Sequence, residues 1–328
     1  MNVNRADPLP WHAAAWRLLD SYRALQRLPQ ALLLIGPHGV GKRILAEQFT
    51  ARLFCARRDA AQPCGSCRDC HWLTAGTHPD FIKIAPEDTD KAITIAQIRQ
   101  LLQDLALKPH TEHERVVLIA PAERMNLAAA NAFLKCLEEP PERTVFLLLS
   151  VTPSLLPATV RSRCQRLVLP CPPCDVAKHW LQGHGVARPE IALALAHGAP
   201  LQALQCAEMD WAAKRQSVFK AWQRAAERQI VLPVLAEEWS KLPEEQLLDW
   251  LIAWTADVIK CALQQTERLT HRDLHQELAA LAHGVEPPAL FAFYDQLLWG
   301  WQQRHSALNK QLFFEEVLMH WAYLHATA

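Results

Sequence analysis

The sequence has no excess charge of either sign and none of the patterns that direct a chain into or across a membrane. It contains 34 Lys and Arg against 34 Asp and Glu, so no overall field draws it onto nucleic acid, although a local basic face is not excluded. No apolar run reaches the roughly 18–20 residues of a membrane span. Met1–Pro10 shows no basic-then-apolar signal pattern. Repeats and low-complexity tracts are also missing. We expect a cytoplasmic globular protein, and 328 residues allow two or three domains.

The ten cysteines do not resemble a disulfide framework, because four of them crowd into one short segment. The spacing is C-x8-C-x2-C-x2-C, formed by Cys55, Cys64, Cys67 and Cys70. Four thiolates this close in sequence suit a tetrahedral Zn²⁺ site, and a site closed by four sulfurs is structural. An iron–sulfur cluster and free thiols are the alternatives. We predict a structural zinc module over residues 55–70, with His71 and His78 as surface or packing residues.

A nucleotide-binding motif is present but incomplete. Residues 36–43 read GPHGVGKR, which fits the P-loop pattern at Gly36, Gly41 and Lys42 but places Arg43 where Ser or Thr is required. The missing hydroxyl normally ligates Mg²⁺, and an arginine cannot ligate a cation. The apolar run 31–35 before the loop predicts a strand, and a helix is expected over residues 41–54. A glycine loop in that position aims backbone N–H groups at an anion.

The acidic residues that a hydrolysing P-loop protein needs are also missing. The strand predicted over residues 116–120 ends in Ala120-Pro121, where Asp-Glu is expected. Glu123 lies beyond the proline and is not taken as equivalent. We therefore expect no intrinsic ATP hydrolysis. Nucleotide binding stays open, because Arg43 could partly replace the cation. The candidate vestigial nucleotide site consists of Gly36, Gly39, Gly41 and Lys42.

The first half of the chain alternates apolar runs with helical patterns, which predicts a parallel sheet flanked by helices. Further strands are expected over residues 81–85, 145–151 and 165–169, and further helices over 94–107, with a Thr94–Gln97 capping box, and 126–139. Prolines at 170, 172 and 173 mark a boundary. The second C-x-x-C pair, Cys171 and Cys174, lies in this proline-rich linker, so we interpret it as coincidental.

Beyond the linker the strand signals end. Two or three short helices are expected over residues 174–207, and the chain reads as helical from residue 208. Eight of the twelve tryptophans fall in this last third, where they either fill a core or form a subunit contact. The predicted domains are an α/β domain over residues 1–169, a small helical domain over 170–207 and an all-α domain over 208–328.

Two further segments carry a resemblance to a known family. Residues 131–141 read NAFLKCLEEPP, and a strand and the triplet Ser162-Arg163-Cys164 follow. With the cysteine insertion, the degraded P-loop and Thr77–Asp80, these segments resemble the AAA+ subunits of clamp loaders, and among them the delta-prime family of bacterial DNA polymerase III. By motif the resemblance covers about residues 9–210. The last third is similar only in length and helical character.

The resemblance implies a RecA-like AAA+ domain, a helical lid and a helical collar that joins the subunits of a pentameric ring. It implies a non-hydrolysing subunit that supplies Arg163 in trans to the adjacent ATPase, with Arg161 and Arg166 as weaker candidates. A guanidinium supplied in this way stabilises charge on the transferring phosphoryl group. The lid arginine of the ATPase relatives is also missing, because residues 198–201 read GAPL.

The implied partners are the gamma/tau ATPase subunits and the delta subunit of the loader, with the sliding clamp and primed DNA bound by the assembled ring. The implied location is the nucleoid-associated replisome in the cytoplasm, as part of the DNA polymerase III holoenzyme. Phosphate contacts from residues 126–139 are compatible with this role. Two alternatives stay open. One is a working AAA+ enzyme with an unusual metal shell. The other is a zinc-dependent DNA-binding module, which is weakened because the residues between the last three cysteines, Gly65, Ser66, Arg68 and Asp69, offer only one basic side chain and no aromatic platform.

Overall fold

The computed structural model describes residues 8–25, 27–57, 62–88, 91–209, 211–303 and 309–326. Residues 1–7, which open the segment without a signal pattern, and residues 58–61 of the predicted zinc module lie outside the described residues. The chain divides into two compact units. One is formed by Met1–Trp180 with Ala199–Gln202, and the other by Leu181–Gly198 with Ala203–Ala328. Among the described residues, no helix is both long and apolar enough to cross a membrane.

The first unit is built on a five-stranded sheet in which every pairing is parallel, in the order β2-β3-β4-β1-β5. The central strands are almost continuously apolar because both faces of the sheet are covered. Each predicted strand is confirmed to within one residue at either end. The strands are β1 (Ala31–Ile35), β2 (Phe81–Ile84), β3 (Arg115–Ile119), β4 (Thr144–Ser150) and β5 (Gln165–Val168).

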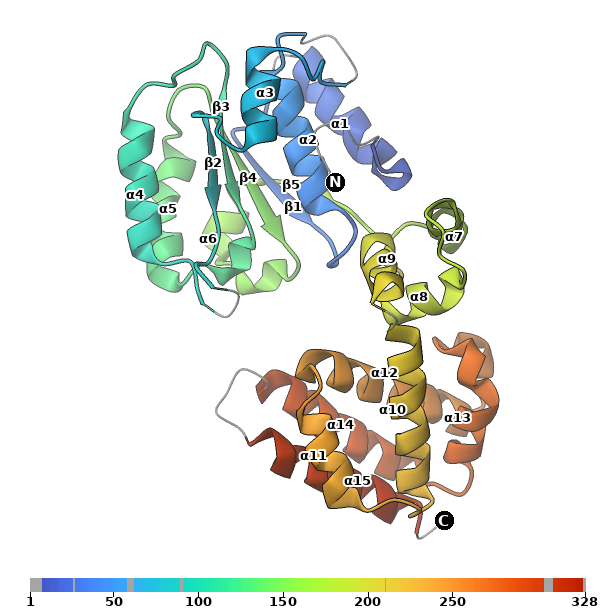
Figure 1. Cartoon of the computed structure of the whole chain (residues 1–328). Helices are drawn as coiled ribbons and strands as arrows, with labels where there is room; N and C mark the ends of the chain where they lie inside the picture. The colour runs from blue at the N-terminus through green and yellow to red at the C-terminus, as the bar shows by residue number, and fades with distance from the viewer. Residues whose placement is uncertain are drawn as a thin grey trace. The chain divides into compact units, whose positions relative to one another are not determined.

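Helices cover both faces of this sheet (Figure 1). On one face α1 (Ala13–Ala24) and α2 (Lys42–Phe54) bury a core with Leu32, Leu34 and Phe49. On the other face α4 (Ile95–Ala106), α5 (Leu127–Glu138) and α6 (Ala158–Arg161) pack on alternate residues of the same strands. Short 3₁₀ turns are η2 (Pro10–His12), η3 (Ala122–Arg124) and η4 (Pro153–Leu155), and α3 (Arg68–Ala75) lies within the cysteine segment.

Side-chain caps fix where two of these helices begin. The predicted capping box is present at α4: Gln97 N–H donates to Thr94 Oγ1 at 3.4 Å, and Thr94 N–H donates to Gln97 Oε1 at 2.9 Å. At α5, the side chain of Asn126 accepts a bond of 2.8 Å from Ala129 N–H. These bonds satisfy N–H groups that have no partner inside the helix.

The second unit is helical in all its described elements, as expected from residue 208 onward. The short helices α7 (Cys174–Gly183), α8 (Pro189–Leu195) and α9 (Pro200–Glu208) confirm the prediction for residues 174–207, and α7 and α9 belong partly to each unit. The remaining elements are α10 (Trp211–Ala226), α11 (Leu232–Ser240), α12 (Glu244–Ala262), η5 (Thr266–Arg268), η6 (Arg272–Leu274), α13 (His275–Ala282), α14 (Pro287–Gln303) and α15 (Lys310–Leu324).

Tryptophans fill the core of the second unit. Trp222 and Trp321 are fully buried and stack with ring centroids 4.1 Å apart. Trp254 lies on the same cluster, 5.6 Å from Trp222. Such rings bury large apolar areas, and their truncation typically costs about 3–5 kcal/mol. Core filling therefore explains most of the tryptophans in this third of the chain, whereas Trp299 is 48% exposed.

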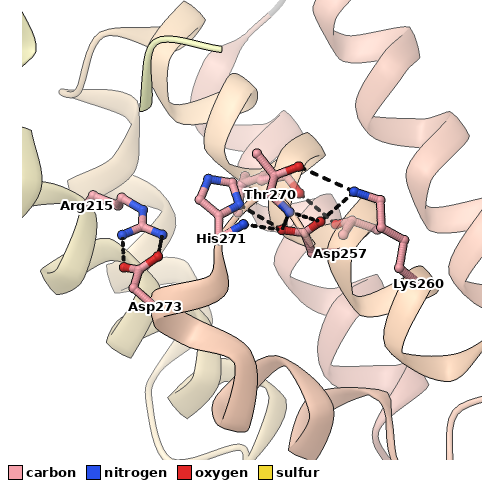
Figure 2. A network of polar contacts seen from close by, with 8 residues as sticks. Arg215, Asp257, Lys260, Thr270, His271 and Asp273 are labelled. Carbon is pink, nitrogen blue, oxygen red and sulfur yellow. Dashed lines mark hydrogen bonds and ion pairs between the residues drawn. The ribbon is translucent and has the colours of Figure 1, made fainter. Parts of the chain in front are cut away.

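A buried carboxylate orders the loop between α12 and α13 (Figure 2). Asp257 is fully buried and accepts bonds from the backbone N–H groups of Thr270 and His271 and from the ammonium of Lys260. Burial alone would raise the pKa of Asp257, but these bonds and the contact with the His271 ring outweigh it and hold that pKa well below its usual value. The loop thus gains order from one charged group.

Candidate functional sites

The phosphate loop joins β1 to α2, as the motif predicts, and its backbone needs glycine. Gly41 forms the N-terminal cap of α2 with φ 92°, and Gly39 has φ 76°. Both values lie in the left-handed region, which residues other than glycine rarely adopt. The strand, loop and helix therefore have the arrangement that places backbone N–H groups and the helix dipole at an anion.

Protein atoms crowd this loop from two sides. A Cβ built on Gly41 would lie 2.5 Å from Leu9 Cδ1, and one on Gly39 would lie 2.6 Å from Gln202 Cβ. Leu201 N–H also donates to Gly39 O at 3.1 Å. The segment before α1 and the first turn of α9 thus pack directly against the loop.

The loop lysine is turned onto its own loop. Lys42 Nζ donates to Gly36 O at 2.6 Å and to Pro37 O at 2.8 Å, and the residue is only 9% exposed. Burial lowers the pKa of Lys42, and the negative charge of Glu123 partly opposes this. Arg43, in contrast, is exposed. The lysine is therefore satisfied by backbone carbonyls within its own chain.

Glu123 joins η3 to the segment that follows β4. The sequence places it beyond a proline and away from the expected acidic position, yet its charge acts on Lys42. Its Oε1 accepts bonds from the backbone N–H groups of Val151 and Thr152, at 2.8 and 3.3 Å. The carboxylate therefore connects η3 to the end of β4 beside the phosphate loop. No signal in the local sequence gives this position, because a turn of three residues separates Glu123 from its strand.

Arg163 lies on the surface just after α6. Its Nη1 donates to Thr159 O at 3.0 Å, and its Nη2 pairs with Glu138 Oε1 at 2.7 Å. The side chain of Arg163 is 36% exposed and that of Glu138 is 51% exposed. A hollow of about 310 Å³ lies beside it, lined by Gln30, Leu137, Pro140 and Cys164 among others. The guanidinium is thus held by two acceptors and open to solvent.

The two other arginines of this segment differ from Arg163. Arg161 is partly buried, and its Nε has no hydrogen-bond partner among the described residues. Arg166 is exposed in β5, at the edge of the sheet. Of the three, Arg163 combines a defined orientation with exposure.

The four cysteines of the insertion come together as predicted. Their Sγ atoms all lie within 4.8 Å of one another, where a tetrahedral Zn²⁺ with bonds of about 2.3 Å would need sulfurs about 3.8 Å apart. They come from the end of α2, the loop after it and α3, and they are Cys55, Cys64, Cys67 and Cys70. The donor set fits a metal ion that prefers thiolate ligands.

Backbone N–H groups donate to two of the sulfurs in this cluster. Cys64 N–H donates to Cys55 Sγ at 3.2 Å, and Cys67 N–H donates to Cys64 Sγ at 3.3 Å. Bonds from the backbone and side chain of Ser66 lower the pKa of Cys64 to about 5. Burial, in contrast, raises the pKa of Cys70. A metal ion would supply the positive charge that lets all four sulfurs ionise.

Aromatic packing connects the cysteine segment to the sheet. His78 stacks on Phe54, the last residue of α2, with centroids 4.0 Å apart and planes 4° apart. Its Nε2 lies 3.4 Å from Asp69 Oδ1 within α3. His78 is buried and His71 is exposed, so packing and surface roles are confirmed for them.

The second C-x-x-C pair has no sign of redox activation. Cys171 is partly buried, Cys174 is exposed at the first residue of α7, and both are free thiols. Burial raises the pKa of Cys171, although the charge of Lys42 partly opposes this. A raised pKa disfavours the thiolate that redox chemistry requires.

Comparison with known proteins gives the family. Residues 11–172 match the family described as DNA polymerase III, delta subunit, and residues 209–322 match its C-terminal model. The chain is 37% identical to DNA polymerase III subunit delta' of Pseudomonas aeruginosa over 97% of this chain and 98% of that protein. It is 30% identical to the Escherichia coli delta' subunit over 92% and 91% of the two chains. The chain is also 38% identical to DNA polymerase III subunit tau/gamma of Haemophilus influenzae, over 42% of this chain and 20% of that protein. The chain therefore belongs to the family of DNA polymerase III delta' subunits.

Proposed function

We propose that this delta' subunit hydrolyses no ATP itself and supplies Arg163 to the ATP site of the adjacent subunit in the clamp-loader ring. The observation that carries the proposal is the contrast between its two cationic sites. Lys42 is buried and bonded to its own loop, whereas Arg163 is exposed and oriented on the surface.

Three features support the absence of hydrolysis. Arg43 and Ala120 stand where a hydroxyl and a carboxylate would hold Mg²⁺, and such groups are each worth orders of magnitude in rate. The charge of Glu123 acts on Lys42, but both of the bonds to Glu123 Oε1 come from backbone N–H groups just after β4. The contact between Gly39 and Leu201 also occupies part of the loop surface. A nucleotide would have to displace protein contacts and would meet no metal shell.

Arg163 is suited to act in trans. The guanidinium keeps its charge at all physiological pH values and can bind two phosphate oxygens at once. An arginine that one subunit supplies to the active site of another in this way, an arginine finger, typically raises the rate of phosphoryl transfer by roughly 10³–10⁵-fold. The phosphate loop follows the carboxyl end of β1, whereas Arg163 lies in the segment between α6 and β5, before the start of its strand. Its exposed side chain is therefore available to another chain.

The remaining parts of the proposed function concern assembly. The last helical elements would form the collar that joins this chain to gamma/tau ATPase subunits and to a delta subunit. The assembled ring would bind the sliding clamp and primed DNA. The local likeness to a tau/gamma subunit supports an origin of both chains from one AAA+ ancestor. We further propose that the cysteine cluster holds a structural Zn²⁺, because four sulfurs leave no open coordination position.

The test is the clamp- and DNA-stimulated ATPase of a reconstituted loader that carries Arg163→Ala in this subunit. Sedimentation must first confirm that the ring assembles. We expect hydrolysis at the neighbouring site to fall by about 10³-fold in single-turnover assays. Arg166→Ala, which removes an exposed arginine of the same segment, is expected to retain the rate. A normal rate in the Arg163→Ala ring would reduce this chain to a scaffold, and a loss with Arg166→Ala instead would reassign the finger.

A further inference from the structure

An exposed carboxylate holds Arg163 in the isolated chain. Glu138 is the last residue of α5, and Arg163 follows α6, so residues far apart in sequence meet through the packing of α5 and α6. The pair is close, at 2.7 Å between Glu138 Oε1 and Arg163 Nη2, while Nη1 is bonded to Thr159 O at 3.0 Å. These two bonds together fix the plane of the guanidinium.

The two bonds leave donors free for another acceptor. Each terminal nitrogen of a guanidinium carries two N–H groups. Because Nη1 uses one of its hydrogens for Thr159 O and Nη2 uses one for Glu138, each nitrogen keeps a second hydrogen. Both residues are substantially exposed, at 36% for the arginine and 51% for the glutamate side chain. A phosphate that approaches from solvent can therefore bind before the carboxylate leaves.

We propose that Glu138 is a positioning residue for Arg163. It orients the guanidinium toward solvent while the neighbouring ATP site is empty, and it yields Nη2 when a nucleotide phosphate arrives. The inference rests on the proposed role of Arg163 in trans. It assigns to Glu138 no contact with nucleotide, only control over where the arginine lies.

The exposure of the pair explains why it can both hold and release. An exposed ion pair is screened by water and salt and is weak, so a phosphate with more negative charge can displace it. A buried pair would not exchange in this way. Arg215 and Asp273 show the contrast: their 2.6 Å pair lies in the second unit with the arginine side chain only 4% exposed. The Glu138 pair has the geometry of a fixed contact and the exposure of an exchangeable one.

The adjacent residue provides a matched control. Glu139 is also exposed, carries the same charge and lies next to Glu138, but it makes no side-chain bond to Arg163. Glu138→Gln and Glu139→Gln therefore change the local charge equally. Only the first weakens the bond to Nη2.

The experiment uses the reconstituted loader with Glu138→Gln, Glu139→Gln, Arg163→Ala and the Glu138→Gln/Arg163→Ala double variant in this subunit. The readouts are kcat and KM for stimulated ATP hydrolysis, ring assembly, and thermal unfolding of the isolated subunit. We expect Glu138→Gln to lower kcat by about threefold to fivefold with normal assembly and an unchanged unfolding temperature. We expect Glu139→Gln to match the wild type and Glu138→Gln to add nothing to Arg163→Ala.

Two results would overturn the inference. One is a normal kcat for Glu138→Gln, and the other is an equal loss for that substitution with and without Arg163. If Arg163→Ala itself retained its rate, the proposed function would fail first. If Arg163→Ala abolished the rate while Glu138→Gln did not change it, the finger would stand and only the positioning role would fall. The four variants therefore separate the two proposals.

Discussion

Lys42 and Arg163 are both cationic residues of the first unit, but their environments are opposite. Lys42 is 9% exposed, lies at the start of α2 and donates to carbonyls of its own loop. Arg163 has a side chain that is 36% exposed and pairs with a carboxylate that is still more exposed. The buried lysine is bonded within its own chain, whereas the exposed arginine can contact another chain.

The largest expected effect is the loss of stability when metal is removed from the cysteine cluster, which adjoins the helix that begins at Lys42. Helix α2 begins at Lys42 and ends at Phe54, next to the first cysteine of the cluster. We expect about one Zn²⁺ per chain by mass spectrometry, and a loss of at least about 3 kcal/mol in unfolding free energy when a chelator or Cys70→Ser removes it, because metal binding adds directly to folding free energy.

Hydrogen exchange would show whether metal removal loosens α2 next to the phosphate loop while the segment that carries Arg163 stays unchanged. Without metal, we expect faster exchange along α2 and unchanged exchange in residues 158–163. Cys174→Ser, which alters an exposed thiol outside the cluster, is the control. A metal-free protein with unchanged stability would refute the structural role, and equal loosening of both segments would erase the contrast between them.

A second prediction uses a cation that is paired with a buried carboxylate. In the second unit Lys260 lies 2.7 Å from Asp257, whose pKa is held well below its usual value. A depressed carboxyl pKa in the folded state stabilises the fold above the unfolded pKa, which is about 3.9, and this contribution is lost as pH falls toward the folded pKa. We expect Asp257→Asn to cost about 2–3 kcal/mol at pH 7 and to flatten the loss of stability below about pH 5.

Urea unfolding between pH 3 and pH 7 would measure this dependence. Asp273→Asn removes the partly exposed partner of Arg215 and serves as the comparison, with a smaller expected cost. A wild-type pH profile for Asp257→Asn would show that the carboxylate does not stabilise the folded loop.

The sequence was sufficient for the sheet because its strands are continuous apolar runs bounded by turns, and for α4 because Thr94 and Gln97 form a local cap. It did not single out α1 or α3. The N-terminal cap of α3 is Cys67, and Cys70 lies within the helix, so the spacing of metal ligands obscures a helical pattern of only eight residues. α1 precedes the first strand and has no side-chain cap. A helix without a side-chain cap and without a clear apolar period is therefore hard to predict from its own segment of sequence.

The site was predictable only in its chemistry. The residue types alone indicate the cysteine cluster and the incomplete loop, whereas Arg163 is singled out only by the resemblance to a family. The partners that decide their behaviour are distant in sequence: Leu9 and Gln202 crowd the phosphate loop, and Glu138 holds Arg163. Such contacts depend on tertiary packing, which no spacing rule within one segment encodes. For the same reason the sequence does not show that the charge of Glu123 acts on Lys42.

The smallest expected effect is the sharpest test of the contrast between the two cations. Lys42→Ala removes the residue on which nucleotide binding by an active P-loop depends. Because Lys42 already donates to Gly36 O and Pro37 O, we expect the reconstituted loader to keep its stimulated ATPase rate within about twofold. The isolated subunit should lose about 1 kcal/mol, since two carbonyl bonds are lost while the burial of a charge is relieved. Calorimetry with ATP should give no heat above dilution for either protein. Measurable binding that disappears in Lys42→Ala would mean that the loop still holds a nucleotide, and Arg163 would then be one of two nucleotide contacts of this chain rather than its only one.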